Sequence, residues 1–87
     1  MLESIKKSLR ITIDNFNEEI LDLIEEAKAD LSISGIKNIS EEDILISRAI
    51  KVYCKANFGL DNKDSEKYQR SYDSLKEHLS LCGEYNE

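Results

Sequence analysis

The sequence predicts a small all-α domain of four helices, one short N-terminal helix and three longer ones, packed around the third. Its composition is the first indication, because 87 residues include no proline and three glycines, with 40% hydrophobic and 34% charged residues. The second is that apolar residues recur at spacings of three and four along most of the chain. Because domains contain about 100–200 residues, we expect one domain over residues 1–87.

The first two helices are predicted over residues 1–10 and from about residue 16 to residues 32–35. The β-branched run at residues 11–13 interrupts the helical spacing and predicts a linker. Asp14 or Asn15 supplies an N-cap oxygen for the second helix, and Asn15 with Glu18 has the spacing of a capping box. The apolar stripe of this helix comprises Phe16, Ile20, Leu23, Ile24, Ala27 and Leu31. The carboxylates on the remaining surface are those of Glu18, Glu19, Asp22, Glu25, Glu26 and Asp30.

The third helix is predicted to begin after an N-cap at Ser40 and to run to about Phe58, where Gly59 stops it. In this prediction Asp43 occupies the third helical position, and Ile39 with Ile44 has the spacing of a hydrophobic staple. Its apolar residues cover about 160° of the helix surface, so it touches more than one neighbour and forms the centre of the fold. The isoleucines at residues 36–39 predict a connection that lies against the domain.

The last helix is predicted to follow a cap at Asp61 or Asp64 and to end at Gly83. Its apolar stripe comprises Tyr68, Tyr72, Leu75 and Leu79. Residues 84–87 are expected to form a frayed tail.

The chemistry-bearing residues favour no enzymatic site. The carboxylates of the second helix lie off its apolar stripe, which predicts that they are solvated. His78 and Cys82 have the i, i+4 spacing of metal ligands, and Cys54 is a third candidate, but a closed zinc site needs four ligands. Two cysteines define no disulfide framework and indicate a reducing, cytoplasmic setting. We therefore expect no catalytic residues, metal or cofactor.

Nucleic acid and membrane are also disfavoured as partners. Twelve basic and eighteen acidic residues give a net charge of −6, the wrong sign for a protein that grips phosphate backbones. Apolar runs such as residues 44–46 reach three residues, against the ~20 that a spanning helix needs. The charged N-terminal residues fit no signal peptide.

Three stretches carry a family resemblance: residues 2–31 (LESIKKSLRITIDNFNEEILDLIEEAKADL), residues 49–59 (AIKVYCKANFG) and residues 68–87 (YQRSYDSLKEHLSLCGEYNE). Together they resemble the small head–tail connector proteins of tailed bacteriophages, also described as head-completion or DNA-packaging proteins. The resemblance implies a non-enzymatic virion assembly protein that forms a ring below the portal protein. Its other implied neighbour is a tail-side completion protein, and DNA passes through the ring without sequence-specific binding. The resemblance also implies that the protein is found in the virion neck after assembly and in the host bacterial cytoplasm before it.

Two oppositely charged patches could form the contacts between subunits of such a ring, since a closed ring joins different faces of neighbouring copies. The acidic patch comprises Glu18, Asp22 and Glu25 of the second helix. The basic patch comprises Arg48, Lys51 and Lys55 of the third. Two alternatives stay open from the residues alone: a small cytoplasmic helical adaptor or regulator that binds one partner protein, and a metal-dependent or carboxylate enzyme.

Overall fold

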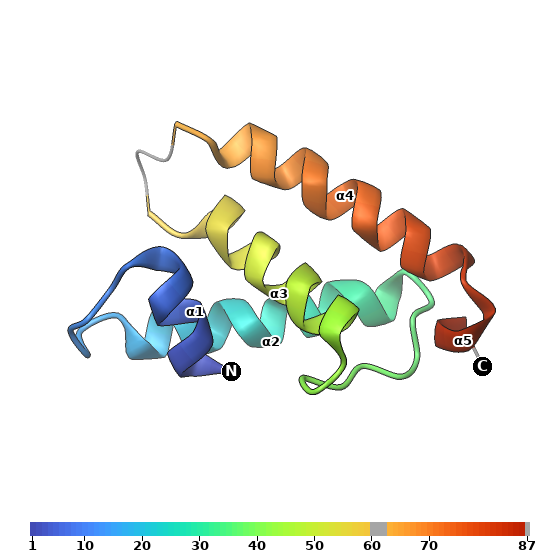
Figure 1. Ribbon diagram of the computed structural model, residues 1–87, viewed down its shortest axis with the longest axis horizontal. Coiled ribbons are helices and arrows are strands. Elements are labelled where there is room, and N and C mark those ends of the chain that lie inside the picture. The colour runs from blue at the N-terminus through green and yellow to red at the C-terminus, as the bar shows by residue number, and fades with distance from the viewer. Residues whose placement is uncertain (60–62, 87) are drawn as a thin grey trace.

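The computed structural model describes residues 1–59 and 63–86, and these residues contain five α-helices. Their bounds are α1 (Leu2–Leu9), α2 (Asn17–Ile33), α3 (Ile44–Asn57), α4 (Ser65–Leu81) and α5 (Gly83–Asn86). Helix α3 lies between α2 and α4 and contacts both, and α1 packs against α2 and α3 (Figure 1). The predicted all-α fold is therefore confirmed, with its third helix at the centre and a fifth, one-turn helix added at the end.

One hydrophobic core joins all five helices. The α2 stripe is buried as predicted except at Phe16, which is 40% exposed, precedes the helix and packs edge-on against Phe58. Ile36 is 1% exposed, so the connection between α2 and α3 does lie against the domain. The buried apolar residues are Ile5, Ile20, Leu23, Ile24, Ala27, Leu31, Ile36, Ile46, Ala49, Ile50, Cys54, Tyr72, Leu79 and Tyr85.

The start of α2 differs from the prediction. Its N-cap is Phe16, which provides no side-chain cap, and the capping box of Asn15 with Glu18 is absent. The Asp14 carboxylate instead accepts a 2.8 Å hydrogen bond from the largely buried Lys6 ammonium of α1. Such charge-assisted hydrogen bonds are stronger than neutral ones, so Asp14 ties α1 to the linker instead of capping α2. The same hydrogen bond lowers the pKa of Asp14.

The start of α3 is also corrected. Its N-cap is Asp43, not Ser40, and the Asp43 carboxylate accepts from the backbone N–H groups of Leu45 and Ile46 at 2.9 and 3.2 Å. A carboxylate gains at this position from the positive end of the helix dipole. The staple does not form, because Ile44 is 83% exposed. At the other end α3 stops as predicted: its last residue is Asn57, and Gly59 has a φ of 84°.

A hydrogen-bonded cluster links α2 to α4. The Tyr72 hydroxyl donates to Asp30 at 2.6 Å, and the Lys76 ammonium donates to the same carboxylate oxygen at 3.0 Å. Burial alone would raise the pKa of Asp30, but these two hydrogen bonds outweigh it and the pKa is lowered. Burial and the hydrogen bond to Asp30 raise the pKa of Tyr72. The ionised Asp30 carboxylate of α2 is therefore held by two hydrogen-bond donors of α4.

Residues 84–86 are not a frayed tail. Helix α4 ends at Leu81, and Gly83 begins α5 instead of ending α4. Tyr85 is 8% exposed, and its hydroxyl donates to the Asp43 carboxylate at 3.0 Å. Its carbonyl accepts from the Lys37 N–H at 2.6 Å. Burial of an aromatic ring with satisfied polar atoms offsets the cost of ordering these residues. We call residues 83–86 the C-terminal clip; residue 87 and the alternative cap Asp61 lie outside the described residues.

Candidate functional site

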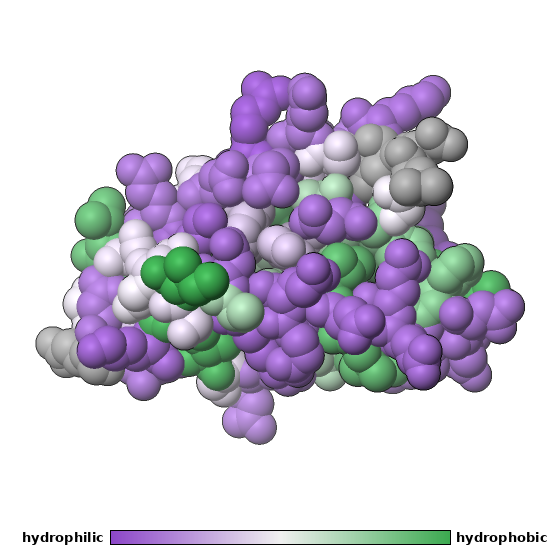
Figure 2. Space-filling view, turned by 180° about the vertical axis from the view of Figure 1, so that it is seen from behind, coloured by the Kyte–Doolittle hydropathy of each residue, from purple (hydrophilic) through white to green (hydrophobic). Residues whose placement is uncertain are grey.

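The first candidate surface is the acidic face of α2, defined by Glu18, Asp22 and Glu25. All three side chains are exposed, as the sequence predicted. Leu21 stands beside them with 46% of its surface exposed. The opposite side of α2 carries the apolar stripe that packs into the core, so the acidic face points away from α3. Seen from behind, much of the lower part of the molecule, where α2 runs, is hydrophilic (Figure 2).

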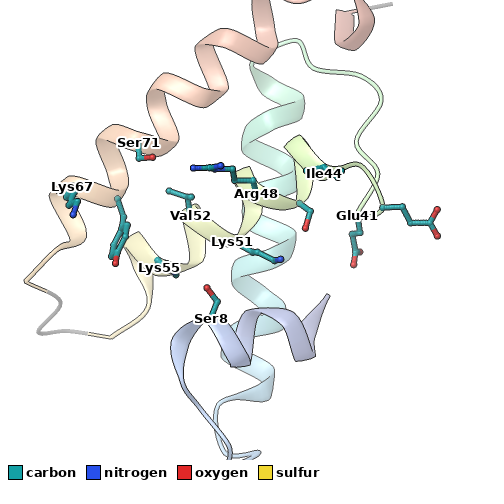
Figure 3. A pocket seen from close by; sticks show the side chains of 12 residues that line it. Ser8, Glu41, Ile44, Arg48, Lys51, Val52, Lys55, Lys67 and Ser71 are labelled. Carbon is teal, nitrogen blue, oxygen red and sulfur yellow. The ribbon is translucent and has the colours of Figure 1, made fainter.

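The second candidate surface is a groove of about 590 Å³ between α1, α3 and α4, which we call the basic groove. Its cations are Arg48, Lys51 and Lys55 from α3 and Lys67 from α4 (Figure 3). Its other lining residues are Ser8, Glu41, Glu42, Ile44, Ser47, Val52, Tyr68 and Ser71. The structure thus brings the three predicted basic residues together and adds a fourth from another helix.

Helical geometry explains why α3 supplies most of this groove. Arg48, Lys51 and Lys55 are separated by three and four residues, so they project from one side of the helix. Lys67 and Tyr68 reach the groove because α4 packs along α3. The Lys55 ammonium lies over the Tyr68 ring, 5.5 Å from its centroid. The sequence placed Tyr68 in the apolar stripe of the last helix and gave Lys67 no role, because the charge pattern of α4 alternates in sign and only tertiary packing assigns the two residues to the groove.

The positive charge of the groove is largely uncompensated. Within residues 1–59 and 63–86, the ion pairs do not include Arg48, Lys51 or Lys67. Glu41, at the other end of the groove, is already paired with Lys28 of α2, and that hydrogen bond lowers its pKa. The basic end of the groove is therefore suited to bind an acidic surface.

The sulfur and imidazole groups lie elsewhere. Cys54 is fully buried, and burial raises the pKa of its thiol to about 12, so the thiol stays protonated at neutral pH. His78 is exposed and Cys82 is half-buried. In the described part of the chain, no three His, Cys, Asp or Glu side chains are grouped so that they could hold a metal ion. None of the helices described there has both the length and the apolar character needed to cross a membrane.

Comparison with known proteins identifies a family. A family model described as "phage connector protein" matches residues 1–86, nearly the whole chain. Neither the curated proteins nor the solved structures contain a match.

Proposed function

The chain belongs to the phage connector protein family, and from this premise we propose that it is a non-enzymatic assembly protein of a phage or prophage virion. In this proposal it docks below the portal protein and forms a ring around the channel through which DNA leaves the head. A tail-side completion protein binds the other side of the ring. The protein acts in the virion neck after assembly and in the host cytoplasm before it.

The observation that carries the ring proposal is the separation of charge between the acidic face and the basic groove. A closed ring joins one surface of each subunit to a different surface of the next. Glu18, Asp22 and Glu25 supply one such surface, and Arg48, Lys51 and Lys55 supply the other. Charge complementarity of this kind speeds association and fixes the register of the contact more than it raises affinity.

The same charge balance supports passage of DNA without sequence-specific binding. The net charge is −6, and carboxylates that face a channel repel the phosphate backbone. Titration with a duplex at several salt concentrations tests this part of the proposal. Tight binding at physiological salt, with a steep loss of affinity as salt rises, would contradict it.

The assembly role is tested with the portal protein of the same phage. Mixed portal and connector should give complexes whose negative-stain images show added ring density on one side of the portal. Deletion of the gene should leave heads that cannot join tails, and plaque formation should be lost. The proposal is wrong if the protein fails to bind the portal and the deletion phage forms normal infectious particles.

A further inference from the structure

We infer that the basic groove receives the first half of α2 from a second copy of this chain, with Leu21 as the apolar anchor of the contact. The inference rests on the proposed self-assembly and specifies which side chains meet. It adds an apolar side chain to the contact, and it adds α4, through Lys67 and Tyr68, to the receiving surface.

Leu21 lies at one edge of the acidic face, one turn from both Glu18 and Glu25. On a helix it shares an arc of about 100° with Glu18, Asp22 and Glu25. A single exposed leucine is ordinary on a protein surface. A large apolar side chain next to a charged face, however, gives that face the mixture of apolar and polar surface that protein interfaces bury.

The groove has the matching layout. Val52 is half-buried in it and Ile44 is 83% exposed, so both offer apolar surface. The Tyr68 ring forms part of the wall that α4 contributes. Arg48 and Lys51 of α3 and Lys67 of α4 line the same groove (Figure 3). Tyrosine and arginine are the side chains that most often supply binding energy at protein interfaces.

The two surfaces cannot meet within one molecule. The apolar side of α2 is packed into the subunit's own core, so its acidic face points outward. The contact must therefore join two copies. It uses a different surface on each, which leads to a closed ring or to an open helical array.

Duplex DNA is the competing occupant of a basic groove, and the charges disfavour it. Glu41 and Glu42 line one end of the groove, where they would repel a phosphate backbone that runs along it, whereas the three carboxylates of an acidic helix face need only the basic end. The net charge of −6 adds a long-range repulsion, which is greater for a duplex, with one negative charge per about 1.7 Å of its axis, than for a second copy. An acidic helix face with a leucine at its edge fits both the charged and the apolar parts of the groove.

Exchange of charges between the two surfaces provides the sharpest test. Asp22→Lys alone and Lys51→Glu alone each place like charges opposite one another, so each should weaken self-association roughly tenfold or more, measured by sedimentation up to about 1 mM protein. An equimolar mixture of the two variants should assemble again. When the two variants alternate, every contact pairs opposite charges. The unchanged Asp22 of one variant meets the unchanged Lys51 of the other, and at the next contact the two substituted side chains meet. Failure of the mixture to recover would overturn the inference.

Removal of the anchor tests the apolar part. Leu21→Ser should weaken self-association by a similar factor, whereas the control Leu81→Ser, at a site that is 78% exposed, should not. Equal effects of the two substitutions would contradict the role of Leu21, as would wild-type protein that stays monomeric to about 1 mM. A short duplex that occupies the groove at physiological salt would assign the groove to DNA. If the wild type forms rings on the portal that none of these substitutions affects, the inference fails and the proposed function stands.

Discussion

Tyr72→Phe should destabilise the domain, because it removes one of the two hydrogen bonds that hold the Asp30 carboxylate between α2 and α4. Tyr72 is fully buried and its hydroxyl lies 2.6 Å from Asp30. Hydrogen bonds to charged groups contribute about 1.5–3 kcal/mol. The Asp30 side chain is 37% exposed and keeps its bond to Lys76, so solvent screening favours the lower end, about 1.5 kcal/mol.

That loss is a substantial part of the total stability. Domains are stable by about 0.05–0.15 kcal/mol per residue, which gives roughly 4–13 kcal/mol for 87 residues. A loss of about 1.5 kcal/mol should lower the melting temperature by about 6–12 °C. Urea unfolding followed by circular dichroism measures the free energy of unfolding directly. Tyr68→Phe is the matched control, since among the described residues no hydrogen bond of the Tyr68 hydroxyl is seen.

The effect should also depend on pH. The pKa of Asp30 is lowered in the folded state from its usual 3.8, so the cluster stabilises the fold above that value. This stability is lost as pH falls through the folded-state pKa, because a protonated carboxyl is a weaker acceptor. The difference between wild type and Tyr72→Phe should therefore narrow as the pH falls below the usual pKa of 3.8. A variant as stable as the wild type at pH 7, or a difference that does not change with pH, would refute the reasoning.

Three further substitutions test the core, the acidic face and the clip. Ala49→Asp places a carboxylate at a fully buried site of α3 and should cost on the order of 3–5 kcal/mol, so an unchanged melting temperature would contradict the core assignment. Glu25→Lys should change stability by no more than about 0.5 kcal/mol and still weaken assembly, and unchanged self-association in sedimentation would count against the acidic face. Tyr85→Ala should accelerate hydrogen exchange of the Lys37 amide while the α3 amides stay protected, and slow exchange at Lys37 would show that the clip does not hold the connection.

The sequence predicted the elements whose apolar spacing is regular. Ile20, Leu23 and Ala27 repeat at helical spacing, and burial of such a stripe depends on little else. The helix starts were less predictable, because several polar residues compete for the same N–H groups. Asp43 caps α3 in place of Ser40. Asp14 binds Lys6, a partner eight residues earlier in the chain, and does not cap α2.

Of the two candidate surfaces, the sequence predicted the residues that share one helix and missed those that a second helix adds. The acidic face belongs to one helix, so its periodicity reveals it. The groove draws Lys67 and Tyr68 from α4, and their neighbours across the groove are set by packing between helices. The burial of Tyr85 could not be predicted from local sequence either, because its partners Lys37 and Asp43 lie more than forty positions earlier.

The C-terminal clip has a consequence for the order of events during synthesis. Asn38 and Glu84, which the clip joins, are 46 positions apart. At about 5–20 residues per second, a ribosome adds the later residue roughly 2–9 s after the earlier one. Until then the C-terminal clip does not contact the nascent connection between α2 and α3, and the Asp43 carboxylate lacks its hydrogen bond from the Tyr85 hydroxyl. A chaperone or an assembly partner that recognises this stretch therefore has a brief interval in which to act, and closure of the clip ends it.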